Sequence, residues 1–244
     1  AMRSDGIKAI SRQTMEAQVV EALRSHILEG TLKPGQKITE ITLSERMGVG
    51  RATLRMGLHR LASEGIVVQT PYTGWAVTRL SRRDVWELWT LRSSLDALAA
   101  RLAAENINPT SRAKVETVYN ALLNACLAGN EALATSLDFE FHMCIVEASG
   151  HSRLLVQYKL VEQQVRMYIQ DSNALLDHNL AALINQHQPI FEAICVGDGE
   201  RAAHEAQQHN QSEGPKLVAS TIARDEAELA TSTANVCAKK AAHD

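Results

Sequence analysis

The chain has 244 residues, of which 45% are hydrophobic, 4% aromatic and 22% charged, and its formal net charge is −3 at pH 7. This composition excludes a disordered chain, a collagen-like chain and a polycationic tail. The length allows one large domain or two small ones, and either can bury a core without disulfides. Because aromatic residues and proline are scarce, we expect a mainly α protein, organised as two domains.

The cysteines and the N-terminal segment indicate a reducing, aqueous compartment. Neither a disulfide framework nor a thiolate zinc site is indicated, because no two cysteines form a CxxC pair: they are Cys126, Cys144, Cys195 and Cys237. The first residues carry no apolar signal-peptide core, and no run of about 18 apolar residues occurs in the sequence. We therefore expect a cytoplasmic protein that does not bind a membrane.

Charge is divided unequally along the chain. Residues 1–80 hold 11 Lys and Arg against 7 Asp and Glu, whereas residues 81–244 hold 14 against 21. This asymmetry favours a head that binds a polyanion and a body with a different task.

Three helices and a β-hairpin are predicted in the first third of the chain. Apolar residues recur at helical spacing from Met15 to Leu28, before Gly30. Shorter amphipathic stretches cover 41–47 and 50–64, with a tight turn between them. Residues 66–69 and 75–80 are then expected to be strands around a turn at 71–74. With its positive charge, this layout over 10–80 is typical of a winged helix-turn-helix.

Helices are predicted almost continuously after residue 80. Ser81 and Asp84 form a capping-box start for a helix that runs to about Glu105. Its apolar residues at helical spacing are Trp86, Leu88, Leu91, Leu95, Leu98 and Leu102. Asn108-Pro109 begins the next helix, to about 128. Four more are expected at roughly 130–149, 151–171, 178–196 and 199–218, which gives a six-helix antiparallel bundle over 81–218. Residues 219–244 hold few large apolar groups, so we expect a frayed helix or a mobile tail there.

Asp138 and His142 are four residues apart, so they share one face of an otherwise apolar predicted helix. A carboxylate and an imidazole at this spacing suit a divalent metal, because their ligand atoms can converge on one point. Taken alone, the pair fits a buried hydrogen bond or a surface pair better than a ligand set.

Two segments carry a resemblance to a known family. ITLSERMGVGRATLRMGLHRLASEGIVVQTPYTGWAV resembles the DNA-binding head of GntR-family bacterial transcription regulators. DFEFHMCIVEASGHSRL resembles the FCD effector domain of the FadR subfamily, and six predicted helices match its VanR-like type. The resemblance implies a repressor that binds double-stranded operator DNA as a homodimer and responds to a small acidic metabolite.

The resemblance also implies which head residues contact DNA. Arg51 and Arg55 match the two arginines of the family's recognition helix, and their i, i+4 spacing places them on one helix face. An arginine there can hold a phosphate or bind guanine through its planar fork. Thr53 lies between them and is a candidate phosphate contact, and Gly74 matches the wing-tip glycine. The alternative is that both arginines simply form a solvated face.

The head departs from the family pattern at four positions. Gly50 stands where the family usually has a Ser or Thr that caps the helix. Ile41 stands where the family has an arginine in the preceding helix, and Met56 stands where it often has a Glu. Gly57 replaces Ala and is expected to weaken the recognition helix by about 1 kcal/mol. The operator sequence therefore does not follow from the resemblance.

For the body, the resemblance implies a metal site formed by Asp138, His142, His187 and His209. The last two are 22 residues apart in successive predicted helices, as in the family. The implied ion is divalent: zinc is the first candidate, and nickel and manganese are alternatives. The four ligands leave one or two coordination positions of the ion open for an effector carboxylate. Arg92 resembles the FCD arginine near the pocket and is our candidate for binding the effector's negative charge. The alternative for Arg92 is an arginine that extends to the rim of the bundle.

The other histidines fail this pattern, and we expect them on the surface: His26, His59, His151, His178, His204 and His243. Two other functions are compatible with parts of this sequence. A metal-dependent hydrolase would use the three-His, one-Asp site to activate water, but no general base is evident beside the ligands and the DNA-binding head would be superfluous. A non-specific architectural DNA protein is disfavoured by the acidic body.

Overall fold

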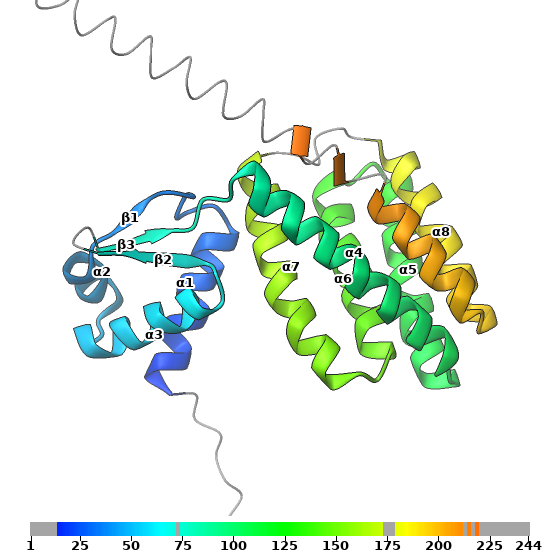
Figure 1. The fold of residues 1–244 in the computed structure, drawn as a ribbon, viewed down its shortest axis with the longest axis horizontal. Coiled ribbons are helices and arrows are strands. Elements are labelled where there is room, and N and C mark those ends of the chain that lie inside the picture. The colour runs from blue at the N-terminus through cyan, green and yellow to red at the C-terminus, as the bar shows by residue number, and fades with distance from the viewer. Residues whose placement is uncertain (1–13, 72–73, 173–178, 212–213, 216–217, 220–244) are drawn as a thin grey trace, which may run out of the picture. The chain divides into compact units, whose positions relative to one another are not determined.

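A computed structural model of the chain describes residues 14–71, 74–172, 179–211, 214–215 and 218–219. The chain forms two compact units, residues 1–79 and residues 80–244 (Figure 1). Among the described residues, no helix is both long and apolar enough to cross a membrane. Apart from residue 219, the predicted tail lies outside the described residues.

The first unit contains the three predicted helices. They are α1 (Met15–Leu28), α2 (Glu40–Met47) and α3 (Arg51–Ser63). The Thr14 side chain caps α1 by accepting a hydrogen bond from the backbone N–H of Ala17. Gly48 ends α2 in the left-handed conformation, with a φ of 65°, which a residue with a side chain rarely adopts. The turn between α2 and α3 is thus as tight as the sequence predicts.

A three-stranded antiparallel sheet completes this unit, with strands β1 (Lys37–Ile38), β2 (Val67–Thr70) and β3 (Gly74–Val77) in the order β1-β3-β2. The predicted hairpin is β2–β3, with Val67 opposite Val77. The strand ends differ from the prediction by one residue, except that β3 ends at Val77 rather than Leu80, and β1 is a strand that the sequence does not predict. A two-residue strand is too short to show an alternating pattern, and pairing with β3 alone defines it.

The core of the first unit joins α1 to α3. Leu54, Leu58 and Leu61 are completely buried on the side of α3 that the sequence assigns to the core. Gly57 lies on the same side, and a Cβ atom added to it would lie 2.9 Å from Cγ1 of Val19 on α1. The missing side chain therefore permits the two helices to approach closely, which explains the departure from alanine at this position.

The Gly57→Ala variant is accordingly expected to be less stable than the wild type, by about 1 to 2 kcal/mol, although alanine is the better helix former. Overpacking against Val19 outweighs the gain of about 1 kcal/mol in helix propensity. Chemical unfolding of the full chain measures the difference. The double variant Val19→Ala, Gly57→Ala should recover part of the loss. A single variant more stable than the wild type would contradict the packing argument.

The second unit consists of helices. They are α4 (Arg82–Glu105), α5 (Pro109–Leu127), α6 (Glu131–Ala148), α7 (Ser152–Ser172) and α8 (Leu180–Val196), followed by a helix over residues 199–211. The predicted capping box of Ser81 and Asp84 is present at the start of α4. Asn108 caps α5, with Pro109 as its first residue. The mainly α fold with a helical second unit is thus confirmed.

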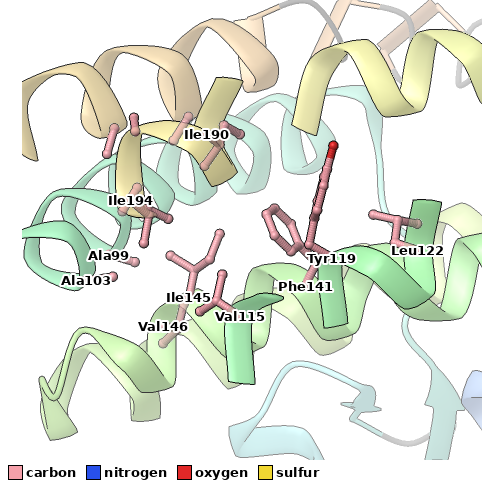
Figure 2. Packing of buried hydrophobic residues seen from close by; sticks show 14 of the residues in the cluster. Ala99, Ala103, Val115, Tyr119, Leu122, Phe141, Ile145, Val146, Ile190 and Ile194 are labelled. Atoms are coloured by element: carbon pink, nitrogen blue, oxygen red, sulfur yellow. The ribbon is translucent and has the colours of Figure 1, made fainter. Parts of the chain in front are cut away.

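Apolar side chains from α4, α5, α6, α7, α8 and the helix of residues 199–211 form the core of this unit, part of which is shown in Figure 2. Phe141 and Ile145 of α6 are buried at its centre, and Tyr119 of α5 stacks on Phe191 of α8 with ring centroids 4.1 Å apart. The contribution of α4 is a row of alanines, whose small side chains permit close helix packing. Both α6 and α8 pack against α4 and α5, so that side chains of α6 and α8 meet in this core, and both helices carry predicted metal ligands.

The leucines whose spacing predicts α4 do not form its core face. They are Leu88, Leu91, Leu95, Leu98 and Leu102. Leu91 is 50% exposed and Leu98 42% exposed, and the other three are half-buried. The buried face instead carries Val85, Trp89, Arg92, Asp96 and several alanines. The leucines therefore form a second apolar stripe beside the core.

Candidate functional site

The predicted DNA-contacting residues lie at the surface of the first unit. Arg51 and Arg55 are exposed on α3, on the side away from its buried leucines, and Thr53 is half-buried between them. Gly74 begins β3 with a φ of +92°, a conformation that favours glycine, and a Cβ atom added there would meet none of the described atoms within 4 Å. The recognition-helix face and the start of the wing strand are thus both accessible.

Arg55 is held by Glu40, a residue that the sequence analysis did not single out. Nε and Nη2 of Arg55 donate hydrogen bonds to the Glu40 carboxylate at 3.2 Å and 2.6 Å. Trp75 of β3 donates its Nε1–H to the same carboxylate at 2.9 Å. The hydrogen bond from Arg55 lowers the pKa of Glu40 and outweighs the opposing effect of partial burial. Glu40 therefore stays ionised and links α2, α3 and the sheet.

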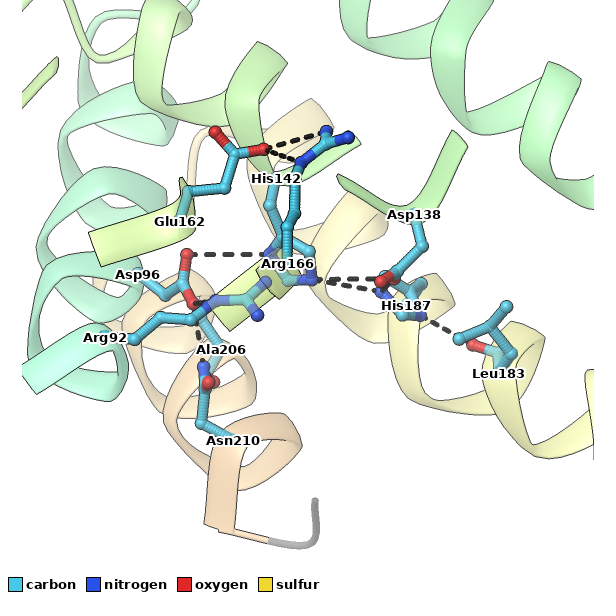
Figure 3. A network of polar contacts seen from close by, with 10 residues as sticks. All are labelled: Arg92, Asp96, Asp138, His142, Glu162, Arg166, Leu183, His187, Ala206 and Asn210. Carbon is cyan, nitrogen blue, oxygen red and sulfur yellow. Dashed lines mark hydrogen bonds and ion pairs between the residues drawn. The ribbon is translucent and has the colours of Figure 1, made fainter. Parts of the chain in front are cut away.

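The four predicted metal ligands come together in the interior of the second unit. Asp138 and His142 belong to α6, His187 to α8 and His209 to the helix of residues 199–211. One ligand atom from each histidine lies within 4.8 Å of the other two. Nε2 of His187 lies 2.7 Å from Oδ1 of Asp138 and 3.2 Å from Nε2 of His142 (Figure 3).

The chemistry of this donor set fits a divalent metal. Two nitrogens 2.0–2.1 Å from a tetrahedral ion are separated by about 3.3 Å, close to the spacing between His142 and His187. The other ring nitrogen of His187 donates to the backbone oxygen of Leu183 at 2.7 Å, so Nε2 is the nitrogen that faces Asp138 and His142. Nδ1 of His142 faces Oδ1 of Asp96 at 3.5 Å. Each of these imidazoles thus has the outer partner that a metal ligand requires.

Burial and mutual repulsion set the charge states in this cluster. Burial lowers the pKa of His209, and the facing His187 and His142 lower it further, so this imidazole is neutral, as a ligand must be. Burial alone would raise the pKa of Asp138, but the charge and the hydrogen bond of His187 hold that pKa well below its usual range. The cluster therefore offers a carboxylate and at least one neutral imidazole to a cation.

Arg92 is buried beside this cluster, with only 3% of its surface exposed, so it does not extend to the rim. Its Nε lies 3.3 Å from Oδ2 of Asp96, which also accepts a hydrogen bond from Nδ2 of Asn210 at 3.0 Å. Figure 3 shows Asp96 between Arg92, His142 and Asn210. Asp96 thus connects the candidate effector arginine to a candidate metal ligand.

Sequence reasoning missed Asp96, Asn210 and Glu40. Asp96 follows Arg92 by four residues on a helix face that is otherwise apolar, and this signal could have found it. The partners of Glu40 and Asn210 are 15 and 114 residues away, so no local pattern shows them.

The remaining histidines lie apart from this cluster. His26, His59, His151 and His204 are exposed, as the sequence predicts, and His59 packs edge-on against Trp75 with ring centroids 4.9 Å apart. His178 and His243 lie outside the described residues. The three cysteines among the described residues are free thiols.

Comparison with known families gives two matches that together cover most of the chain. The family described as bacterial regulatory proteins, gntR family, matches residues 15–77, and the FCD domain family matches residues 87–212. The second match covers more than half of the chain. The first match includes α3, and the second includes Asp138, His142, His187 and His209.

Curated relatives and solved structures agree with these matches. The "Probable D-xylose utilization operon transcriptional repressor" of Paenarthrobacter nicotinovorans is 26% identical over 83% of this chain and 88% of its own. The "HTH-type transcriptional repressor GlaR" of Escherichia coli (strain K12) is 26% identical over 77% and 88%. McbR/YncC of E. coli has the same fold, with a TM-score of 0.67 at 22% identity over 84% of this chain and 98% of that one. These relatives are regulators and not enzymes, so the hydrolase alternative is set aside.

Proposed function

Because the chain belongs to the GntR family of bacterial transcription regulators and carries an FCD domain, we propose that it is a metal-containing repressor controlled by a small acidic metabolite. The observation that carries this proposal is the buried cluster of His142, His187 and His209, with Asp138 in contact with His187 and the buried Arg92 nearby. A cation site and a buried arginine in one interior suit a ligand that bears carboxylates.

Operator binding is assigned to the first unit, as residues 10–80. Arg51 and Arg55 on α3 would enter the major groove, Thr53 would contact a phosphate and Gly74 would bring the wing close to the minor groove. The exposure of the α3 face and the net positive charge of this part of the chain support the assignment.

Metal and effector binding are assigned to the second unit, as residues 81–218. The donors are three imidazoles and one carboxylate, a set that suits zinc and also nickel or manganese. When bound, the ion supplies a Lewis-acidic position for an effector carboxylate. Arg92 would bind the remaining negative charge with the guanidinium nitrogens that Asp96 does not hold.

Regulation then requires that the effector binds the DNA-competent and DNA-incompetent states with different free energies. Asp96 offers a physical link, because it contacts Arg92, His142 and Asn210 from three segments of the second unit. A change at the effector site would thereby reach the helix of residues 199–211.

A homodimer is proposed on the leucine stripe of α4. Leu88, Leu91, Leu95, Leu98 and Leu102 repeat at intervals of three and four residues, the spacing of a coiled-coil seam. A stripe of this kind is self-complementary, so two copies related by a two-fold axis can bury it against each other. Two heads on one operator would multiply a modest affinity of each.

The double variant Leu91→Asp, Leu98→Asp is therefore expected to sediment as a monomer and to bind operator DNA at least tenfold more weakly. Buried carboxylates would face each other across the seam. Analytical ultracentrifugation measures the mass, and circular dichroism checks the fold. The matched control is Leu127→Asp on α5, where the leucine is 73% exposed and lies outside the stripe. If the double variant is still a dimer, the leucine stripe of α4 is not the dimer interface.

The proposed function is tested by fluorescence anisotropy on DNA from immediately upstream of the gene, against a random duplex at fixed salt. We expect preferential binding of the upstream DNA and a change in its affinity when zinc and the correct acidic metabolite are added. Equal affinity for both duplexes would contradict the operator role. An affinity that no metabolite changes would contradict effector control.

A further inference from the structure

We propose that Glu40 determines operator specificity by holding the Arg55 guanidinium side-on, so that its free edge reads a guanine. The inference rests on the proposed operator binding by α3. It adds to the head a residue that does not itself contact a base.

The geometry divides the five guanidinium hydrogens of Arg55 into two groups. Glu40 takes the Nε hydrogen and one Nη2 hydrogen, at 3.2 Å and 2.6 Å between the heavy atoms. One Nη2 hydrogen and one Nη1 hydrogen remain at the end of the planar fork, and the second Nη1 hydrogen points to the side of Cδ. Two donors at that end match O6 and N7 of guanine, which accept a bidentate contact in the major groove.

Glu40 is itself fixed by the structure around it. Its side chain is only 17% exposed, and the Trp75 indole, 2% exposed in the core, donates to it at 2.9 Å. Glu40 is also the first residue of α2, where the helix dipole favours a carboxylate. Since this anchor is formed before DNA binds, Arg55 loses less conformational freedom on binding.

The charge of Glu40 also changes what Arg55 prefers. An arginine paired with a carboxylate carries little net charge, so it gains less from a phosphate of arbitrary sequence. The nearby carboxylate further repels the DNA backbone, which penalises non-specific contacts. Both effects lower affinity for random DNA more than affinity for a site that presents guanine to Arg55.

The test is selection from a pool of randomised duplexes, with the full-length wild type and the Glu40→Gln variant, followed by sequencing. We expect the wild-type motif to contain a guanine in each half-site whose preference falls about tenfold in the variant. Affinity for a random duplex should rise, and the slope of log affinity against log salt should steepen by about one unit per head.

Two further variants separate this role from others. Glu45→Gln removes a negative charge from an exposed position on the same helix and should keep the guanine preference. Trp75→Phe removes the indole donor but keeps a ring, and should retain most of the preference if Glu40 acts through Arg55. Thermal unfolding verifies that each variant is folded.

The outcomes distinguish this inference from the proposed function. A wild type that enriches no motif would overturn operator binding itself. A wild type that enriches a motif while folded Glu40→Gln enriches the same motif, with an unchanged guanine preference, would overturn the role of Glu40 alone. Loss of preference in Trp75→Phe equal to that in Glu40→Gln would also overturn it, in favour of a structural effect on the wing.

Discussion

Removal of the metal ion with a chelator is expected to lower the free energy of unfolding of the second unit by about 4 kcal/mol. A ligand present at a thousand times its dissociation constant stabilises the folded state by about this amount. The corresponding fall in melting temperature is about 8 to 16 °C for a protein of this size. The effect is large because the bound ion would link α6, α8 and the helix of residues 199–211 through its four donors. Without the ion, a carboxylate and three imidazoles stay close together in the interior of the unit.

Differential scanning calorimetry of the zinc-loaded and chelator-treated chain measures this difference. In His187→Ala the chelator should have little effect, because an inner donor is missing. His204→Ala is the matched control, since His204 is exposed on the same helix as His209 and should respond like the wild type. An unchanged melting temperature in the wild type, with zinc absent from both samples by elemental analysis, would contradict the metal site.

Arg51→Ala is expected to weaken binding to the upstream DNA by about a hundredfold. A bidentate arginine contact contributes about 1 to 3 kcal/mol, and a dimer loses it in both half-sites. Affinity for a random duplex should fall much less, because only one charge per head is removed. The variant is therefore expected to lose both affinity for the operator and preference for the operator over random DNA.

Anisotropy titrations at fixed salt provide both affinities. Arg83→Ala is the matched control, because Arg83 is an exposed arginine at the start of α4, outside the first unit, and its loss should leave DNA binding unchanged. A fall of equal size on operator and random DNA would assign Arg51 to phosphate contacts only. An unchanged affinity for both duplexes would show that α3 does not contact the DNA.

The sequence by itself determined the elements whose signals are local. Gly48 ends α2, the box of Ser81 and Asp84 begins α4, and Asn108 with Pro109 begins α5, because each of these signals acts through bonds within one helical turn. The spacing of Arg51 and Arg55 placed both on one face for the same reason. Membership of the family could also be inferred, since its motifs are short and continuous.

The identity of the four candidate ligands required the resemblance, because no pattern within one helix links α6 to α8. The partners of these ligands were decided only by the tertiary structure. Asp96 acquires its role from His142 and Asn210, which reach it from other helices. Such contacts depend on how the helices pack against one another, and this packing produces no repeating pattern in the sequence.

Three features of the fold were decided in the same way. Helix propensity alone predicts that Gly57 weakens α3, whereas the structure shows that Gly57 leaves room for Val19 of α1. The leucines of α4 predicted a helix correctly but not its buried face, because its alanines allow closer packing than leucines do and the ion pair of Arg92 and Asp96 is buried on the same side. Glu40 carries no sequence signal of its own, and its place is defined by the side chains of Arg55 and Trp75, which both donate hydrogen bonds to it. Helical periodicity specifies which residues share a face, whereas the neighbour that each face meets is set by the shape and polarity of the other helices.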